Sequence, residues 1–431
     1  MAGNFVQLHN HTHYSLLDGA SKVPDLVKRV KELGMPAVGI TDHGNMHGAY
    51  ELWRAAVDSG VKPIIGIEAY VTPETARQDK TRVSWDTNWT PVPGHARNPD
   101  DVSGGGLITH LTMWAENDEG LVNLIKASSV ANLEGRVMRY PRMDKEVLST
   151  YSKGVIASSG CPSGIIQTRL RLGQFDEALR AAGEFQDIFG KDNFYIELMD
   201  HGLSIESKVT GDLLTIAKKL GAPLLATNDS HYVMEADKDA QDAMLCINSG
   251  ATLDDPNRFK FEGSGYYIKS AEEMRELFKD HPDACDNTLE IAERCNVIFD
   301  DHEDGAFMPQ FDCPEGWDET SLFLKKVEEG LEKRYDGKPA DGGAQAGRLR
   351  MRRHLPDAVL RLLPRRRRLH QLGEGARRDG GPGARLRRRG HGRLCDGHHR
   401  ARSAQARPDL REVPEPRACV PARYRRRLRS R

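Results

Sequence analysis

Residues 4–11 read N-F-V-Q-L-H-N-H, a short apolar run that ends in two histidines two positions apart. Similar short runs recur downstream, and most are followed by a stretch with helical spacing of its apolar residues. The further runs are Ala37–His43, Ile64–Tyr70, Leu107–Trp114, Val155–Ser159, Phe194–Met199 and Pro223–Asn228. The amphipathic stretches are Val23–Leu33, Tyr50–Ser59, Leu121–Leu133, Phe175–Phe189 and Glu206–Leu220.

Strand and helix thus alternate seven times over about 235 residues. This alternation predicts an α/β protein with a parallel sheet, and the number of units favours a closed (βα)7 barrel of the TIM type. An open doubly wound sheet is the alternative, although no G-x-G-x-x-G follows the first strand. The polar, Gly- and Pro-rich stretch 74–106 is expected to form a long loop over the top of the barrel.

The pattern changes after residue 235. Residues 236–337 are expected to form a small helical connecting domain, interrupted by a short strand at Phe261–Lys269 and a loop at Asp300–Trp317. Its expected helices are Asp237–Ser249, Ala271–Phe278, Asp286–Cys295 and Glu319–Arg334. The predicted domains are therefore 1–235, 236–337 and 338–431.

Metal-binding residue types stand at or near the ends of the predicted strands. In the first run His9 and His11 are two residues apart, so both side chains point to one face, and Asp229 and His231 repeat this spacing in the last run. The other candidates are Asp18, His43, Glu68, His110 and Cys161. The ends of barrel strands converge on one rim, so we expect these groups to meet there.

Imidazoles, carboxylates and one thiolate together favour Zn, Fe or Mn. Two adjacent metals generate a hydroxide nucleophile and neutralise both oxygens of a phosphoryl displacement, and Glu68 could bridge them. A lone histidine at a strand end more often has a structural role. Two pairs with a spacing of two residues, His9/His11 and Asp229/His231, are harder to obtain by chance. Cys161 alone would be a small buried apolar residue.

The motifs together resemble a PHP domain, the polymerase-and-histidinol-phosphatase fold. They are H-N-H-T-x-Y-S (9–15), T-D-H-G (41–44), G-I-E-A-Y (66–70), T-H-L-T (109–112), S-G-C-P-S-G (159–164) and T-N-D-S-H-Y (227–232). The segments Y-I-E-L-M-D-H-G-L, G-Y-Y-I-K-S with A-E-E-M, and N-T-L-E-I-A-E-R-C extend the resemblance to the N-terminal region of bacterial replicative DNA polymerase III alpha subunits. The resemblance covers residues 4–336.

The resemblance implies a metal-dependent phosphoesterase, and in members with a full ligand set a 3′–5′ exonuclease that proofreads the growing strand. It implies two to three divalent ions (Zn, Mn or Fe), a DNA 3′ primer end as substrate and replisome subunits such as the sliding clamp as partners. The implied metal ligands are His9, His11, Asp18, His43, Glu68, His110, Cys161, Asp229 and His231. We assign catalysis to Glu68, Asp229 and His231, and the orientation of ligands to Glu197, His201 and Asp42. His13 departs from the family, which usually has an acid there.

The last 91 residues have a different composition. Residues 341–431 hold 27 Arg, no Lys and eight acids, a net charge of +19, which leaves −20 for residues 1–340. A basic arm for nucleic acid is one interpretation. However, Ile, Asn, Lys, Phe and Trp are all absent, which indicates GC-rich DNA read out of frame. We expect this Arg-rich tail to be disordered.

A one-base shift accounts for the tail. Frame-shifted copies of the family's F-I-N-W-A-K, G-P-G-R-G-S and P-D-I-D-V-D-F segments match Leu369–Gly373, Gly381–Leu386 and Ala422–Leu428 in one register. The polymerase motifs themselves are missing from the sequence, so the chain is expected to lack polymerase catalytic residues.

The remaining composition limits the class of protein. The seven cysteines include no C-x-x-C pair, and the N-terminus has no secretory signal pattern, which favours a reducing cytoplasmic setting. No apolar stretch is long enough for a membrane span. Two other functions stay open, a non-catalytic PHP scaffold or docking module and a stand-alone phosphatase of the histidinol-phosphate type.

Overall fold

The computed structural model describes residues 4–16, 18–86, 98, 100, 106–263, 265–299 and 312–335. The chain divides into two units, residues 1–300 and residues 301–431. In the second unit the described structure is one helix, α11 (Glu319–Tyr335). The Arg-rich tail and its frame-shift interpretation lie outside the described residues.

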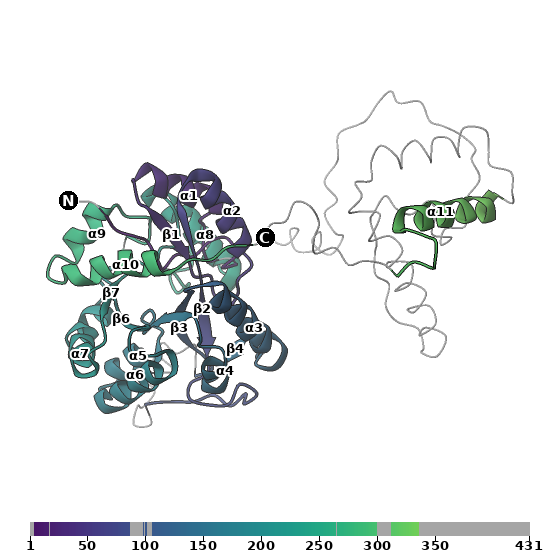
Figure 1. Ribbon diagram of the computed structural model, residues 1–431. Coiled ribbons are helices and arrows are strands. Elements are labelled where there is room, and N and C mark those ends of the chain that lie inside the picture. Colours follow the sequence, from purple (N-terminus) through teal and green to yellow (C-terminus); the bar gives the residue numbers. More distant parts are fainter. Residues whose placement is uncertain are drawn as a thin grey trace, which may run out of the picture. The chain divides into compact units, whose positions relative to one another are not determined.

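A curved sheet forms the centre of the first unit (Figure 1). Its order is β1-β2-β3-β5-β6-β7, with the short β4 paired to β2. The strands are β1 (Ala37–Ile40), β2 (Lys62–Val71), β3 (Thr109–Ala115), β4 (Arg142–Met143), β5 (Val155–Ser158), β6 (Phe194–Leu198) and β7 (Leu224–Ala226).

The N-terminal segment closes this sheet into a barrel. Gln7 forms a parallel bridge with Val38 of β1, and Asn10 forms one with Ser230, just beyond β7. Backbone hydrogen bonds support both contacts, such as His11 N to Ser230 O at 2.8 Å. The predicted first strand therefore takes its place in the ring through isolated bridges, and the predicted α/β barrel is confirmed.

One strand runs opposite to the prediction. β3 pairs antiparallel with both β2 and β5, whereas the alternation predicted parallel strands throughout. The described residues of the connection between β2 and β3 form no helix, so the chain leaves and returns at the same end of the barrel. An antiparallel pair needs only such a loop, while a parallel pair needs a crossover.

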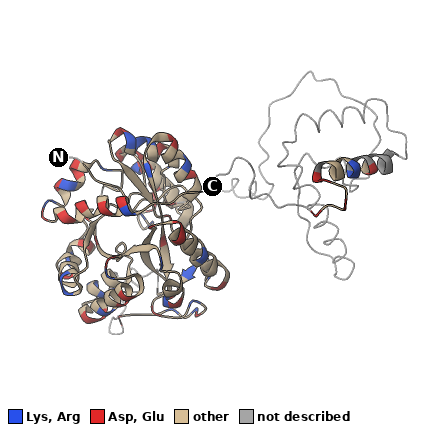
Figure 2. Ribbon diagram, in the orientation of Figure 1, with Lys and Arg blue, Asp and Glu red and all other residues tan. Residues whose placement is uncertain are grey.

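Helices cover the outside of the barrel (Figure 1). Five predicted helices are found within a few residues of their expected bounds; they are α1 (Val23–Glu32), α2 (Ala49–Ser59), α3 (Asp118–Glu134), α6 (Phe175–Phe189) and α7 (Ser204–Leu220). The short helices α4 (Lys145–Thr150) and α5 (Ile165–Arg171) were not predicted. In the ribbon, acidic and basic residues lie mainly on the helices, and the strands are mostly of other residue types (Figure 2).

Beyond the barrel strands the chain forms α8 (Lys238–Ser249), α9 (Ala271–Leu277) and α10 (Pro282–Arg294). α10 begins four residues before the expected start, because Pro282 supplies the fixed φ that suits a first helical turn. The predicted strand Phe261–Lys269 is wrong, since it reduces to a single bridge between Tyr232 and Tyr267. Whether residues 236–337 are a domain of their own stays a prediction.

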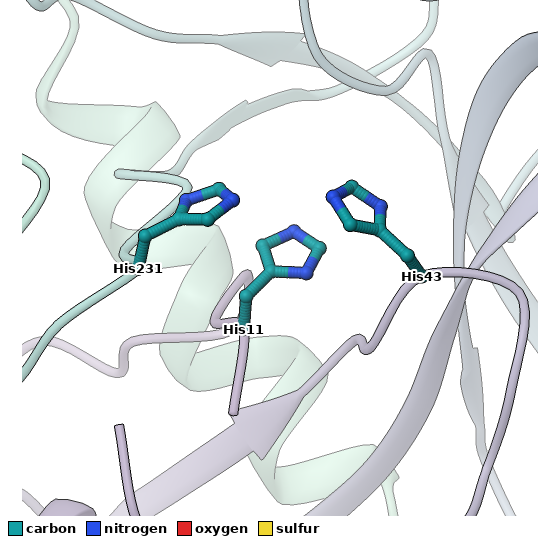
Figure 3. A group of neighbouring side chains, drawn as sticks. All are labelled: His11, His43 and His231. Carbon is teal, nitrogen blue, oxygen red and sulfur yellow. The ribbon is translucent and has the colours of Figure 1, made fainter. Parts of the chain in front are cut away.

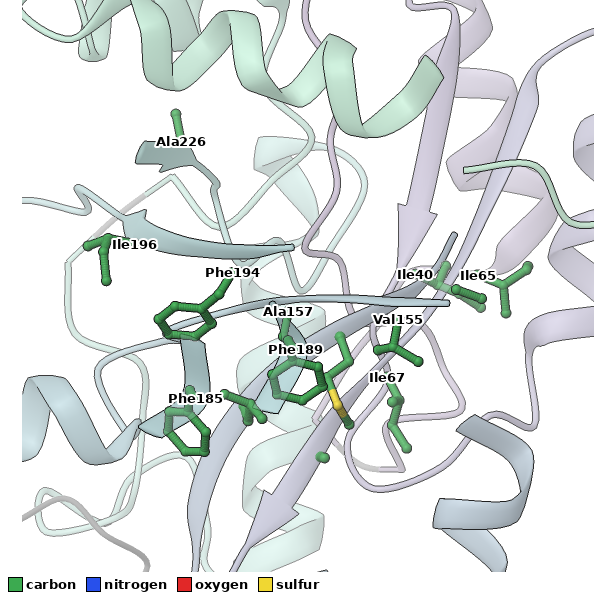
Figure 4. Close-up of a cluster of buried hydrophobic side chains, with 14 of the residues drawn as sticks. Ile40, Ile65, Ile67, Val155, Ala157, Phe185, Phe189, Phe194, Ile196 and Ala226 are labelled. Carbon is green, nitrogen blue, oxygen red and sulfur yellow. The ribbon is translucent and has the colours of Figure 1, made fainter. Parts of the chain in front are cut away.

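The outward side chains of the strands pack against the surrounding helices (Figure 4). Ile65, Ile67, Val155 and Ala157 alternate with inward residues along β2 and β5 and join the large outer apolar core. The cluster reaches the aromatic rings of α6 and β6, such as Phe194. This burial of apolar surface is what holds the helices on the barrel.

The inward side chains form an apolar plug at the end of the barrel where the parallel strands begin, which we call the lower end. The plug consists of Val6, Leu8, Ala37, Ile64, Trp114, Ile156, Tyr195 and Leu225, closed from below by Ile291, Ala292 and Cys295 of α10 and its end. Gly66 has no room for a side chain, because a Cβ would lie 2.7 Å from Trp114 Cδ1 and 2.5 Å from Met113 O. The barrel interior is therefore filled below the rim.

Candidate metal centre

On the same inward face the side chains are polar at the opposite end of the barrel, where the parallel strands end; we call this end the upper rim. Along β2, Ile64 and Gly66 are followed by Glu68, and beyond Tyr195 of β6 comes Glu197. Leu225, Thr227 and Asp229 repeat the pattern at the end of β7. Because strand side chains alternate with a period of two, each strand carries plug residue and rim residue on one face.

The direction of β3 explains the position of His110. This histidine is the second residue of β3, not a residue at the strand's C-terminal end as predicted. Since β3 runs down from the rim, its first residues lie where the other strands end, and His110 pairs with Tyr70 near the end of β2. The antiparallel strand thus still delivers its histidine to the shared rim.

Three groups of side chains have donor atoms close enough to share an ion. They are His11, His43 and His231; His9, His11 and Asp229; and His43, Glu68 and His110, each with its donor atoms within 4.8 Å of one another. Figure 3 shows the first group, with three rings from distant segments facing a common space. The groups share residues, so together they form one continuous cluster.

Glu68 is the centre of the cluster. Its Oε1 lies 3.1 Å from His110 Nδ1 and 3.5 Å from His9 Nε2, and its Oε2 lies 2.6 Å from His43 Nδ1 and 3.5 Å from His11 Nε2. Only 1% of the Glu68 surface is exposed. Both oxygens of this carboxylate therefore face ring nitrogens of the cluster.

Asp18 and Cys161 lie at the edge of the cluster. Asp18 Oδ2 is 3.1 Å from His43 Nε2, and Cys161 Sγ is 3.3 Å from His110 Nδ1. Asp229 lies between the two N-terminal histidines, with Oδ1 3.0 Å from His11 Nε2. The structure therefore brings all nine candidate ligands to one rim.

The outer ring nitrogens fix the orientation of three histidines. His9 Nδ1 is 2.7 Å from Glu197 Oε1, and His231 Nδ1 is 2.8 Å from the carbonyl oxygen of Asp229. Since these oxygens only accept, Nδ1 carries a proton, and Nε2 is the ring nitrogen that faces the cluster. The hydroxyl proton of Ser15 goes to Asp42, so this oxygen accepts from His11 Nδ1 at 2.9 Å.

Several buried atoms that face the cluster lie close to one another without hydrogen-bond geometry, and they have no other hydrogen-bond partner in the described structure. They are both carboxylate oxygens of Glu68, Asp229 Oδ1, Asp18 Oδ1, His43 Nδ1 and His231 Nε2. Buried polar atoms of this kind cost stability unless another partner satisfies them. Oriented imidazole and carboxylate lone pairs that converge without hydrogen bonds fit divalent metal ions.

The electrostatics of the cluster keep its acids ionised. Burial alone would raise the pKa of Glu68, but His110 and His43 hold it well below its usual value. Burial likewise opposes ionisation of Asp18, yet the nearby His43 and His231 lower its pKa to about 2. His9 and His231 also lower the pKa of Asp229.

Burial and nearby charges shift the pKa values of the histidines and of the thiol in different directions. Burial, together with the charges of His43 and His231, lowers the pKa of His11 to about 3. Burial would lower the pKa of His9 too, but Asp229 and Glu197 raise it well above its usual value. Burial and the nearby Glu68 and Asp229 raise the pKa of the Cys161 thiol.

A layer of hydroxyl groups beneath the cluster was missed by the sequence analysis. Ser158 and Thr227 donate to the two oxygens of Glu197, each at 2.5 Å, and so hold the carboxylate that orients His9. Thr112 Oγ1 lies 3.4 Å from His9 Nδ1. These residues lie between plug and rim on the inward face, so the period of two was the signal that could have found them.

The other two residues expected to orient ligands differ in their surroundings. Asp42 accepts hydrogen bonds from Thr12 and Ser15 and thereby reaches His11 through the Ser15 hydroxyl. His201 is bound by Glu206, at 2.7 Å, and by the carbonyl oxygen of Asn228, at 2.9 Å. His201 therefore contacts the backbone of Asn228, the residue directly before Asp229.

Comparison with known proteins gives a family match and several relatives. Residues 7–201 match the PHP domain. The chain is 50% identical over 340 residues to "DNA polymerase III subunit alpha" of Mycobacterium leprae and of Mycobacterium tuberculosis, which covers 79% of this chain and 28% of each relative. The same subunit of Borreliella burgdorferi is 39% identical over 335 residues, 77% of this chain and 27% of the relative. The chain thus spans little more than a quarter of the length of these relatives.

Solved structures give weaker similarity. An amidohydrolase from Chromobacterium violaceum, with bound sulfate and no metal, matches 53% of this chain and 87% of its own with 15% identity and a TM-score of 0.31. A putative metal-dependent phosphoesterase from Bifidobacterium adolescentis matches 53% and 88%, with 15% identity and a TM-score of 0.30. Among the described residues, no helix has the length and apolar character that a membrane span requires.

Proposed function

This chain carries a PHP domain and is related over 79% of its length to DNA polymerase III subunit alpha, and we propose that it hydrolyses the 3′-terminal phosphodiester of DNA. The observation that supports the proposal best is the cluster of nine candidate ligands, five of which (Asp18, His43, Glu68, Asp229 and His231) have facing oxygen or nitrogen atoms without a hydrogen-bond partner. The reaction would add water across the terminal P–O3′ bond and release a nucleoside monophosphate, as in 3′–5′ proofreading.

The chain's own residues would hold and shape the site. His9, His11, Asp18, His43, Glu68, His110, Cys161, Asp229 and His231 would bind two to three divalent ions, with Zn, Mn or Fe favoured by the donor types. Ions bound there would supply positive charge for the phosphate oxygens and activate a water molecule.

Within this set, Glu68, Asp229 and His231 would lie nearest the reacting phosphate. The low pKa of Glu68 and Asp229 keeps both carboxylates charged across the neutral range, so no proton competes with the ions for these oxygens. Glu197 would hold His9 with Nε2 toward the cluster, and Asp42 and His201 would hold the segments that carry His11 and Asp229.

The wider role follows from the relatives. We propose that the chain corresponds to a fragment of a replicative polymerase subunit, with the DNA 3′ primer end as substrate and replisome subunits such as the sliding clamp as partners of the full-length protein. Such a role belongs in the cytoplasm. Polymerisation itself is not proposed for this chain, since the polymerase motifs are absent from its sequence.

The test is nucleotide release from a primer with a 3′ mismatch. The purified chain is incubated with Mn or Zn, and both the bound metal and the released mononucleotide are measured. Metal-dependent release that Asp229→Asn abolishes supports the proposal. If two or more ions are bound per chain and no nucleotide is released, the exonuclease is excluded. Less than one ion per chain after dialysis would favour a non-catalytic scaffold.

A further inference from the structure

A pocket of about 480 Å³ lies beside the metal centre, next to His231, and the proposed chemistry does not use it. It is lined by the start of α8, including Lys238, and by residues 258, 260–263 and 266, including Lys260, Phe261 and Tyr266. Its volume lies in the usual range for ligand pockets.

Aromatic rings lead from the metal centre to solvent along this segment. The His231 and Phe261 rings meet edge to face, with their centroids 4.6 Å apart. The centroid of the Phe261 ring lies 4.9 Å from that of Tyr266 and 6.1 Å from that of Phe259. Phe259 is 62% exposed. The outer face of the Phe259 ring is therefore available for a planar ligand, and only the Phe261 ring separates it from the candidate metal ligand His231.

The charges around the pocket favour an anionic ligand. Arg258 and Asp242 neutralise each other through a two-pronged ion pair, which also ties the segment to α8. The exposed Lys238 and Lys260 then outnumber Glu262 among the remaining charged groups of the lining. Free ammonium groups beside exposed aromatic rings suit phosphates that alternate with flat bases.

We propose that this pocket, together with the exposed Phe259 ring beside it, binds the last unpaired nucleotides of a single DNA strand and feeds its 3′ end to the metal centre. The inference rests on the proposed function and adds the residues that handle the strand. A base stacks on Phe259, the next contacts Phe261, and Lys238 and Lys260 bind the phosphates. Stacking does not depend on base identity, so the pocket would accept any mismatched end.

The experiment measures binding without hydrolysis. A twelve-nucleotide oligothymidylate with a 5′ fluorescent label is titrated with the full 431-residue chain in EDTA, and anisotropy gives the Kd. Phe259→Ala should weaken binding about tenfold, which is the scale of one base-aromatic stack. Phe259→Trp should restore it. Lys260→Gln should reduce the slope of log Kd against log salt by about 0.7 if one phosphate contact is lost.

The matched control is Leu253→Ala, another exposed apolar side chain, 56% exposed, on the same connection. It should bind the oligonucleotide as the unmodified chain does. An unchanged Kd in Phe259→Ala, or equal losses in Phe259→Ala and Leu253→Ala, would overturn the inference. Failure of the proposed function looks different, since strand binding would still depend on Phe259 while the metal-loaded chain released no nucleotide.

Discussion

The two ends of the barrel interior are built from the same strands yet have opposite chemistry. At the lower end, Ile64, Trp114 and Leu225 belong to a closed apolar plug. Four residues beyond Ile64 and Leu225 on the same inward face, Glu68 and Asp229 belong to a cluster of charged groups. The plug makes the fold stable, and the rim uses that stability to hold groups that would repel or be hydrated if they were free to move.

The difference appears in how the buried groups are satisfied. The one polar atom of Trp114, Nε1, donates to Leu8 O at 3.0 Å, whereas both oxygens of Glu68 have no hydrogen bond. An unsatisfied buried polar group costs about 1–3 kcal/mol. Natural proteins keep such costs mainly at functional sites. The contrast therefore predicts that plug variants lose stability and rim variants lose metal.

The largest effect should come from Trp114→Ala in the plug. The side chain is fully buried, so its removal leaves a cavity and should lower the free energy of unfolding by about 3–5 kcal/mol. Urea denaturation followed by circular dichroism measures this. Metal content per folded chain should stay the same, and a parallel loss of metal would show that plug and rim are not separable.

Metal itself should stabilise the rim. An ion present at 100 times its Kd should raise the free energy of unfolding by about 2.7 kcal/mol, because it binds the folded chain alone. The increase should vanish in Glu68→Gln, which removes the central carboxylate charge, and persist in Glu177→Gln, the same change at an exposed position of α6. Thermal melts with and without Mn or Zn measure it. An equal increase in Glu68→Gln would place the ion elsewhere.

The residues of the rim could be predicted from the sequence better than the direction of strand β3. The His9/His11 and Asp229/His231 pairs follow from a period of two, and the structure does bring these side chains together. The direction of β3 was predicted wrongly, since alternation reads the same in both directions and the decisive feature is a connection without a helix. The strand expected at Phe261–Lys269 is reduced to one bridge between Tyr232 and Tyr267, and within this segment Phe261 and Tyr266 contact His231 at the rim.

The hydroxyl layer tests how far plug and rim depend on each other. Glu197→Gln keeps the shape but loses the charge that accepts hydrogen bonds from His9, Ser158 and Thr227. Loss of such a support typically weakens metal affinity by about 10–100-fold. Isothermal titration with Zn measures it, and Glu177→Gln on the outer face of α6 is the control. Unchanged affinity would mean that His9 is oriented by other contacts.

The smallest effect concerns α10, which comes from the segment predicted as a separate domain yet closes the plug. Ile291 is fully buried against the barrel residues, so Ile291→Val should lower the free energy of unfolding of the whole first unit by about 0.5–1.5 kcal/mol in a single transition. Ile298→Val, at a side chain 70% exposed, should change nothing. A second unfolding transition that alone responds to Ile291→Val would mean that α10 folds apart from the barrel and that the plug is complete without it. A single transition would mean that the helical segment is part of the base on which the metal rim is built.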